Sequence, residues 1–115
     1  MAEIYHMLPA ATWEALAGQQ KYQAPSLASE GFIHCTAGER NLIEVANRFY
    51  RDEAAAEWVV LVIDPARVRA DVRWAVQADG LAYPHVHGAL NLDAVSAAHP
   101  FPRDPEGRFL AFLQQ

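Results

Sequence analysis

The chain has 115 residues, which fits one domain spanning residues 1–115, and its 52% hydrophobic and 20% charged residues are typical proportions for a globular protein. Its formal net charge of −5 argues against non-specific nucleic-acid binding, because such binding requires a basic surface. The single cysteine, Cys35, excludes an intrachain disulfide and a cysteine-based zinc cluster. We therefore expect a reducing, cytoplasmic location, with no signal peptide and no membrane span.

The first part of the chain is predicted to alternate strands and helices. Residues 3–7 form a strand, and residues 10–18 form a short helix that ends at Gly18. A polar loop over residues 19–30 leads to a second strand over residues 31–36, whose sequence is GFIHCT.

A second helix follows this strand. Its buried face is predicted from residues that recur with helical spacing, namely Leu42, Val45, Ala46, Phe49 and Tyr50. Thr36 and Glu39 would form a capping box at its start. The end of the GFIHCT strand would therefore lie near the electropositive end of the helix.

The second part of the chain is predicted to be mostly strands. A strand is predicted over residues 57–64, and its residues 58–63 are all apolar, so it is expected to be central and covered on both faces. Further strands are predicted over residues 71–76, 85–90, 91–101 after an initial turn, and 108–113. The last of these would be an edge strand through which a dimer could pair. Two main helices in the N-terminal half and strands beyond them indicate a single-domain α+β fold with a split, mostly antiparallel sheet.

Four of the five histidines lie in or beside apolar, strand-like segments. Strand alternation places His34 on one face with Phe32 and Thr36, with Cys35 on the opposite face, so His34 and Cys35 are not expected to share one pocket. His85 and His87 point the same way, about 7 Å apart. His6 belongs to the first strand.

Three interpretations of these histidines remain open at this stage. The pair His85 and His87 could provide two metal ligands, with His6 or His34 as a third, although no nearby carboxylate completes a recognisable set. The histidines could instead be core residues whose ring nitrogens are hydrogen-bonded. Alternatively, neutral imidazoles could donate hydrogen bonds to the ribose or phosphate oxygens of a ligand. We favour the third interpretation and assign no metal.

Two other residues allow both a structural and a functional interpretation. Cys35 precedes a helix, which could lower its pKa, but its predicted face favours a buried, inert thiol. Glu30, just before GFIHCT, is either a turn carboxylate or a site residue, and the sequence does not separate these roles.

Several motifs resemble those of the bacterial domain-of-unknown-function 952 family. The segments EGFIHCT (residues 30–36) and PHVHGALN (residues 84–91) are similar to the EGFIHCS and PHIYGPLN types of that family. The resemblance covers about residues 3 to 112 and implies a family without an assigned activity.

A more distant resemblance is to the ADP-ribosyltransferase fold, which includes the RNA 2′-phosphotransferases. The segments FIHCT, VANRF and VVLVID occur in the same order as three motifs of that fold. The resemblance implies that His6 contacts the ribose beside nicotinamide, that His34 is the second-strand histidine and that Arg48 is the helix arginine. Thr36, on the face of His34, joins His6 and Arg48 as an expected cofactor-binding residue.

The chain also departs from the motifs of that fold. Met7 and Leu8 follow His6, where the ADP-ribosylating enzymes often have Gly and then Ser or Thr. His85 and His87 replace the usual glutamate of the third motif. We therefore expect a cleft, lined by the four histidines, that binds NAD or a related nucleotide or phosphate. If the protein is an ADP-ribosyl or phosphoryl transferase, His34, His85 and His87 are the expected catalytic residues. The alternative is a non-catalytic metal-binding or structural protein.

Overall fold

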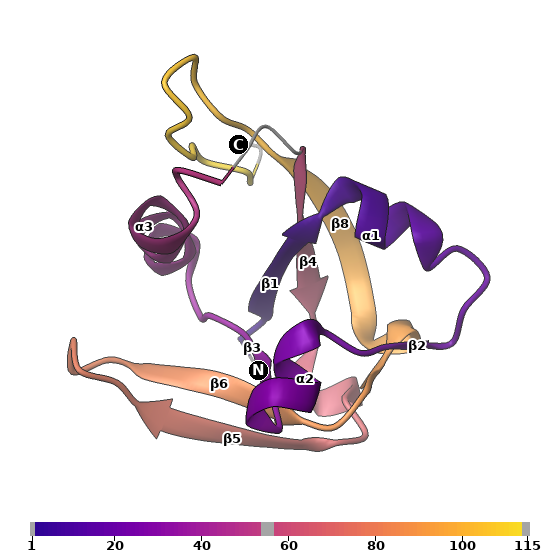
Figure 1. Ribbon diagram of the computed structural model, residues 1–115. Helices are drawn as coiled ribbons and strands as arrows, with labels where there is room; N and C mark the ends of the chain where they lie inside the picture. The colour runs from indigo at the N-terminus through magenta and orange to yellow at the C-terminus, as the bar shows by residue number, and fades with distance from the viewer. Residues whose placement is uncertain (1, 54–56, 114–115) are drawn as a thin grey trace.

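The computed structural model describes residues 2–53 and 57–113, and its strands form three small antiparallel sheets (Figure 1). One sheet has the order β1 (Ile4–Pro9), β4 (Trp58–Ile63) and β8 (Val95–Phe101). A second has the order β3 (Ile33–His34), β6 (Ala82–His87) and β5 (Asp71–Val76). The short pair β2 (Lys21–Tyr22) and β7 (Leu90–Asn91) forms the third. The predicted α+β class and its mostly antiparallel, split sheet are confirmed.

Strand β4 is central in its sheet and is covered on both faces, as its continuous apolar sequence predicted. Alternate residues of β4 enter two different cores: Leu61 and Ile63 join one cluster, and Val60 and Val62 join the other. The same alternation holds in β1, where Ile4 and Tyr5 are divided between the two clusters. Burial of apolar side chains on both faces therefore fixes the register of β1 against β4.

Two helices lie on opposite sides of this sheet (Figure 1). Helix α1 (Ala10–Ala15) contributes Trp13 to the first core, and the chain leaves the helix through a turn at Gly18, whose φ of +80° suits a glycine. Helix α3 (Glu39–Phe49) contributes Leu42 and Ala46 to the second core. Two single 3₁₀ turns complete the described elements, η1 (Pro65–Arg67) and η2 (Leu92–Ala94).

Helix α3 differs from its prediction at both ends. The capping box is absent, because Gly38 occupies the N-cap position and no side chain caps the helix. Glu39 instead accepts hydrogen bonds from the backbone N–H groups of Phe112 and Leu113, at 2.9 and 2.8 Å. At the other end, Phe49 is 65% exposed and does not belong to the buried face.

The predicted edge strand over residues 108–113 is wrong. Phe109 and Phe112 are buried to about 1% exposure in the second core. Asn47 of α3 binds the backbone of Phe109 on both sides, donating to its carbonyl at 3.2 Å and accepting from its N–H at 2.7 Å. The polar groups of this segment are therefore satisfied partly by side chains of α3 and partly by backbone bonds to residues 102–104, where an isolated antiparallel bridge pairs Arg103 with Phe109.

The predicted loop over residues 19–30 contains two elements that the sequence did not reveal. Strand β2 has only two residues, and helix α2 (Pro25–Glu30) has only six. Pro25 begins α2 and Gly31, with a φ of +87°, ends it, so the start and stop signals were present. One turn and a half of helix is too short to show a hydrophobic period.

A single bridge joins the first and second sheets where β3 ends. Tyr5 and Thr36 exchange two backbone hydrogen bonds of 2.8 Å each. This bridge fixes the end of β3 against β1 and leads the chain directly into α3. The region between β3, β6 and α3 is the setting of the candidate site.

Candidate functional site

A cavity of about 490 Å³ lies between α3 and the β3–β6–β5 sheet. We call it the histidine cavity. It is lined by His34, Cys35 and Thr36 at the end of β3, by Glu44, Val45, Arg48, Phe49 and Tyr50 of α3 and its end, and by Gln77, Ala78, Asp79, Tyr83 and His85 of the β5–β6 hairpin. Segments that are distant in sequence thus meet around one space.

His85 packs against Phe32 and His34, and no hydrogen bond to its ring nitrogens is found among the described residues. The antiparallel register sets His34 opposite His85, and their ring centroids lie 5.3 Å apart. The ring of His85 stacks on Phe32, with centroids 4.0 Å apart and planes inclined by 10°. The residue is only 6% exposed.

His85 lines the histidine cavity, and its ring nitrogens are not fully buried. Within residues 2–53 and 57–113, the only fully buried side-chain polar atom without a hydrogen-bond partner is Nε1 of Trp58. The nitrogens of His85 have no partner in that part of the chain either, so they are not sealed inside the protein. Burial lowers the pKa of His85, and the neighbouring His34 and His87 lower it further. A neutral imidazole offers one donor and one acceptor to a ligand.

His34 is paired with a carboxylate. Its Nε2 lies 3.0 Å from Oε2 of Glu30, and both side chains are about half exposed. A proton on Nε2 donates to the carboxylate and leaves Nδ1 of the neutral ring as an acceptor. Glu30, which the sequence left open, is thus in contact with a predicted site residue. It ends α2, and its position four residues before His34 allows the contact.

His6 lies beneath β3 and does not line the cavity. Its Nδ1 donates to the backbone carbonyl of His34 at 2.7 Å, and its Nε2 accepts from the hydroxyl of Tyr22 at 2.8 Å. Burial lowers the pKa of His6 to about 4, so the ring is neutral at neutral pH. In this structure His6 supports the backbone that carries His34, and its contact with a ribose stays a prediction.

Of the remaining predicted site residues, some line the histidine cavity and one does not. Arg48 and Thr36 line the histidine cavity together with His34 and His85. His87 does not, although its ring lies 5.3 Å from Phe32 and 6.5 Å from His85. The structure therefore brings together four of the six predicted site residues, and His6 and His87 flank them.

Asp79 and Tyr83 are lining residues that the sequence did not assign to the site. The hydroxyl of Tyr83 donates to Oδ2 of Asp79 at 2.5 Å, and this hydrogen bond lowers the pKa of the Asp79 carboxyl. The other carboxylate oxygen accepts from the N–H of Leu81 at 2.9 Å, which places Asp79 in a turn. A turn motif such as Asp-Gly carries no signal that its aspartate also faces a cavity.

Cys35 also lines the cavity, so the expectation that His34 and Cys35 would not share one pocket is wrong. Cys35 does follow the alternation, because it joins the same core cluster as Ile33, but it still contributes to the cavity lining beside His34. The expectation of a buried thiol is confirmed, because Cys35 is 2% exposed. Burial raises the pKa of the Cys35 thiol to about 12, which keeps it protonated and unreactive.

Two further properties bear on the class of site. Among the described residues, no group of three His, Cys, Asp or Glu side chains is placed to hold a metal ion. In the same part of the chain, no helix is both long and apolar enough to cross a membrane.

Comparisons with known proteins give a family and a fold. Residues 7–98 match the family described as "Protein of unknown function (DUF952)". No curated protein matches the chain. The crystal structure of protein CC0527 from Caulobacter crescentus is 25% identical, with a TM-score of 0.80 over 94% of this chain and 93% of that one. Its solution NMR structure, also 25% identical, gives a TM-score of 0.74 over 93% and 90% of the two chains.

Proposed function

The chain belongs to the DUF952 family, whose description assigns no activity, and we propose from the cavity itself that it binds NAD or a related nucleotide. The observation that carries this proposal is His85, which is 6% exposed, is stacked on Phe32 and lines the histidine cavity, with no hydrogen bond to its ring nitrogens among the described residues. Because these nitrogens are not fully buried, a ligand in the cavity can hydrogen-bond them without any change in the core.

The size and chemistry of the cavity support a nucleotide. A volume of about 490 Å³ is within the range of small-molecule sites. The side chains of Arg48 and Thr36 supply donors for phosphate and ribose oxygens, and Nδ1 of His34 can accept from a ribose hydroxyl. Phe49, which is 65% exposed at the end of α3, offers an aromatic face for a base or a nicotinamide ring.

The charges around the cavity favour a ligand with both signs of charge. Arg48 is accompanied by the carboxylates of Glu44 and Asp79. A simple phosphate would meet repulsion from these two groups. NAD combines an anionic diphosphate with a cationic nicotinamide ring, so it complements such a lining better than a simple anion does.

The proposed chemistry follows from the resemblance to the ADP-ribosyltransferase fold. The step would be attack of an acceptor at the anomeric carbon of the nicotinamide ribose, with nicotinamide leaving. Such a step passes through an oxocarbenium-like state and depends on orientation and charge stabilisation. His34, with Nδ1 free as an acceptor, and His85 are the groups placed to act on the incoming acceptor. His87 does not line the cavity, and its ring centroid lies 6.5 Å from that of His85. His6 donates a hydrogen bond to the backbone carbonyl of His34.

A thermal-shift titration with NAD tests the binding proposal. NAD at one hundred times its dissociation constant should add about 2.7 kcal/mol, which is a rise of roughly 10 °C for a chain of this length. His85→Ala and Arg48→Ala should abolish the rise, each compared with its own ligand-free melting temperature. His99→Ala is the matched control, because His99 does not line the cavity.

The absence of any rise at millimolar NAD would refute the nucleotide proposal. Activity is tested separately, by measuring nicotinamide released from NAD by the wild type and by His34→Ala. Binding without release would leave a nucleotide-binding protein that performs no transfer on its own.

A further inference from the structure

Strand β5 is the edge of the β3–β6–β5 sheet, and no strand of the described residues pairs with its outer side (Figure 1). The hydrogen bonds of the β5–β6 hairpin show which backbone groups face that side. At the turn, Gln77 donates to the carbonyl of Leu81 at 2.9 Å, so the residues two, four and six positions before Gln77 also bind β6. The residues between them point their N–H and C=O groups outward, and these are Val72, Trp74 and Val76.

The position of Pro84 supports this assignment. Pro84 of β6 stands opposite Trp74, and its carbonyl accepts from the N–H of Cys35 at 3.0 Å on the β3 side. Pro84 has no N–H with which to bind β5. The backbone hydrogen bonds that the described residues form outside the strand ladders involve none of the three outward-facing residues. The outer side of β5 therefore carries a row of open donors and acceptors.

Exposed apolar side chains accompany this open edge. Trp74 is 54% exposed and Val76 is 73% exposed, and strand alternation places both on one face of the sheet. On the other face, Nη2 of Arg73 lies 3.2 Å from Oδ2 of Asp71, so these two charges compensate each other. An edge with free backbone groups and apolar side chains is a template for another strand. The edge therefore fits a β-strand better than a small molecule.

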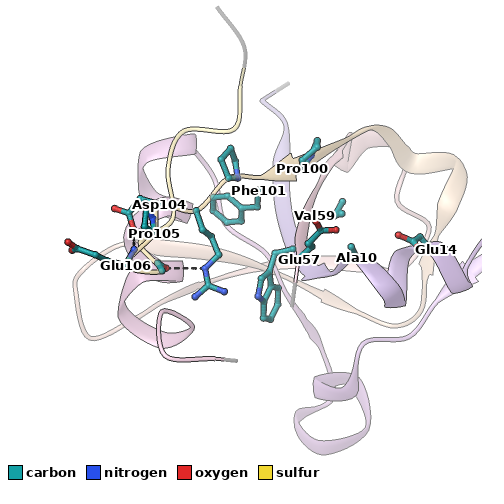
Figure 2. Close-up of a pocket in the computed structure, with 13 residues that line it drawn as sticks. Ala10, Glu14, Glu57, Val59, Pro100, Phe101, Asp104, Pro105 and Glu106 are labelled. Atoms are coloured by element: carbon teal, nitrogen blue, oxygen red, sulfur yellow. Dashed lines mark hydrogen bonds between the residues drawn. The ribbon is translucent and has the colours of Figure 1, made fainter. Parts of the chain in front are cut away.

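The edge strand β8 is less suited to such pairing. Its register against β4 is shifted between Val62 and Ile63. Pro100 removes one donor from β8, and a proline on an edge strand blocks pairing there. Figure 2 shows Pro100 and Phe101 in the lining of a second cavity, of about 860 Å³, which borders the end of this strand. Strand β5 contains no proline and keeps one continuous register with β6.

We propose that β5 pairs antiparallel with the β5 strand of a second copy of this chain, about a two-fold axis at Trp74. The two three-stranded sheets would then form one continuous sheet across the dimer. Trp74 would exchange two backbone hydrogen bonds with Trp74 of the second copy, and Val72 would do so with Val76. All three outward-facing residues would gain partners, and the exposed apolar side chains would pack across the interface.

The charges of β5 favour this register. With the axis at Trp74, Arg73 stands opposite Ala75 and Asp71 stands opposite Gln77 of the second copy, so no like charges face each other directly. With the axis at Arg73, the two arginines would stand directly opposite each other, which is destabilising. The sequence of β5 is therefore compatible with a copy of itself when Trp74 lies on the axis.

The dimer should be weak and reversible, because one pair of six-residue strands buries less surface than a standard stable interface. Each copy carries a net charge of −5, which opposes association, so added salt should strengthen the pairing. This salt response separates strand pairing from association between opposite charges, which salt weakens.

Sedimentation equilibrium of the full chain tests the proposal. The average mass should rise from that of a monomer at about 10 μM chain toward that of a dimer at about 1 mM. Trp74→Lys and Val76→Lys should each raise the dissociation constant about tenfold, because a charged edge opposes strand pairing. Leu110→Lys, which alters an exposed apolar residue outside β5, should leave it unchanged. A wild type that stays monomeric at about 1 mM, or equal weakening by Leu110→Lys, would overturn the proposal.

Disulfide cross-linking tests the register. In the proposed dimer, the Cα atoms of the two residues at position 74 lie about 5.5 Å apart, a distance that a disulfide spans. The two residues at position 76 would be at least about 13 Å apart. Trp74→Cys should therefore form a covalent dimer about tenfold faster than Val76→Cys, although Val76 is the more exposed side chain and Cys35 is buried in both variants. Equal rates would refute the pairing about Trp74, and none of these outcomes depends on whether NAD binds.

Discussion

His6 should make the stability of this protein fall steeply in mild acid. The ring is fully enclosed, donates to the carbonyl of His34 and accepts from the hydroxyl of Tyr22. A second ring proton on Nε2 would displace the tyrosine hydroxyl and place a charge in the core. The pKa of His6 is therefore lowered to about 4 in the folded protein, chiefly by burial, against an ordinary value of 6.5.

The size and the pH range of the effect follow from this difference. Between pH 6.5 and pH 4 the unfolded chain binds a proton at His6 that the folded chain does not, so stability falls as the pH is lowered through this range. The full loss corresponds to about 3 kcal/mol below pH 4, and about 2 kcal/mol of it is already present at pH 5. Above about pH 7, His6 contributes no pH dependence.

Urea unfolding at pH 8 and pH 5 measures this loss, and His6→Gln isolates it. A glutamine amide can donate to His34 and accept from Tyr22 but does not titrate, so the variant should lose about 2 kcal/mol less than the wild type between the two pH values. His99→Gln leaves His6 in place and should keep that component of the loss. Equal losses for the wild type and His6→Gln would refute the view that the buried neutral ring sets the acid sensitivity.

Three further predictions concern stability and reactivity. Cys35 should not react with a thiol reagent such as dithionitrobenzoate in the native protein and should react fully in urea, because burial raises its pKa to about 12. Glu39→Gln should lower the free energy of unfolding, measured by urea denaturation, by about 2 kcal/mol, because the Glu39 carboxylate accepts hydrogen bonds from the N–H groups of Phe112 and Leu113. No change in that free energy would mean that the two bonds form equally well to an amide. Phe112→Ala should cost about 3–5 kcal/mol in the same assay, because the ring is buried between Tyr5 and Phe101, and a cost below 1 kcal/mol would contradict that packing.

The elements that the sequence predicted well are those with a long, regular pattern. Strand β4 was recognised by an uninterrupted apolar run, and β5 agrees with its predicted range over residues 71–76. Helix α3 was recognised by its period, although its N-cap and its exposed Phe49 were not. In each of these elements, several residues show the same pattern of burial on a defined face.

The elements that the sequence predicted poorly are short or are satisfied by side chains. Strand β2 has only two residues, which is too few to show alternation, and β3 covers only two residues of the strand predicted over residues 31–36. The segment 108–113 has an apolar composition that suits a strand, but Asn47 and Glu39 of α3 bind part of its backbone. These hydrogen bonds connect residues more than sixty positions apart, so no local sequence pattern predicts them.

The candidate site shows the same division. Alternation placed His34 with Phe32 and His85 with His87, but only the β3–β6 register shows that His34 stands opposite His85. The contact of Glu30 with His34 depends on where α2 ends. The residue types alone could therefore indicate the histidines as candidate site residues. Which of them lie close together could be known only from the three-dimensional structure.

The histidines in the strands have different surroundings, and these explain how apolar strands can contain them. His6 is a core residue in which both ring nitrogens are bonded, so its burial is compensated. One of those bonds holds the backbone carbonyl of His34, which fixes the strand that carries His34 toward the cavity. His85, opposite His34, lines the cavity, and its ring nitrogens have no hydrogen-bond partner among the described residues. The buried His6 therefore supports the strand, whereas His34 and His85 present ring nitrogens that a ligand could bind, and this difference is the reason for testing the cavity with a ligand.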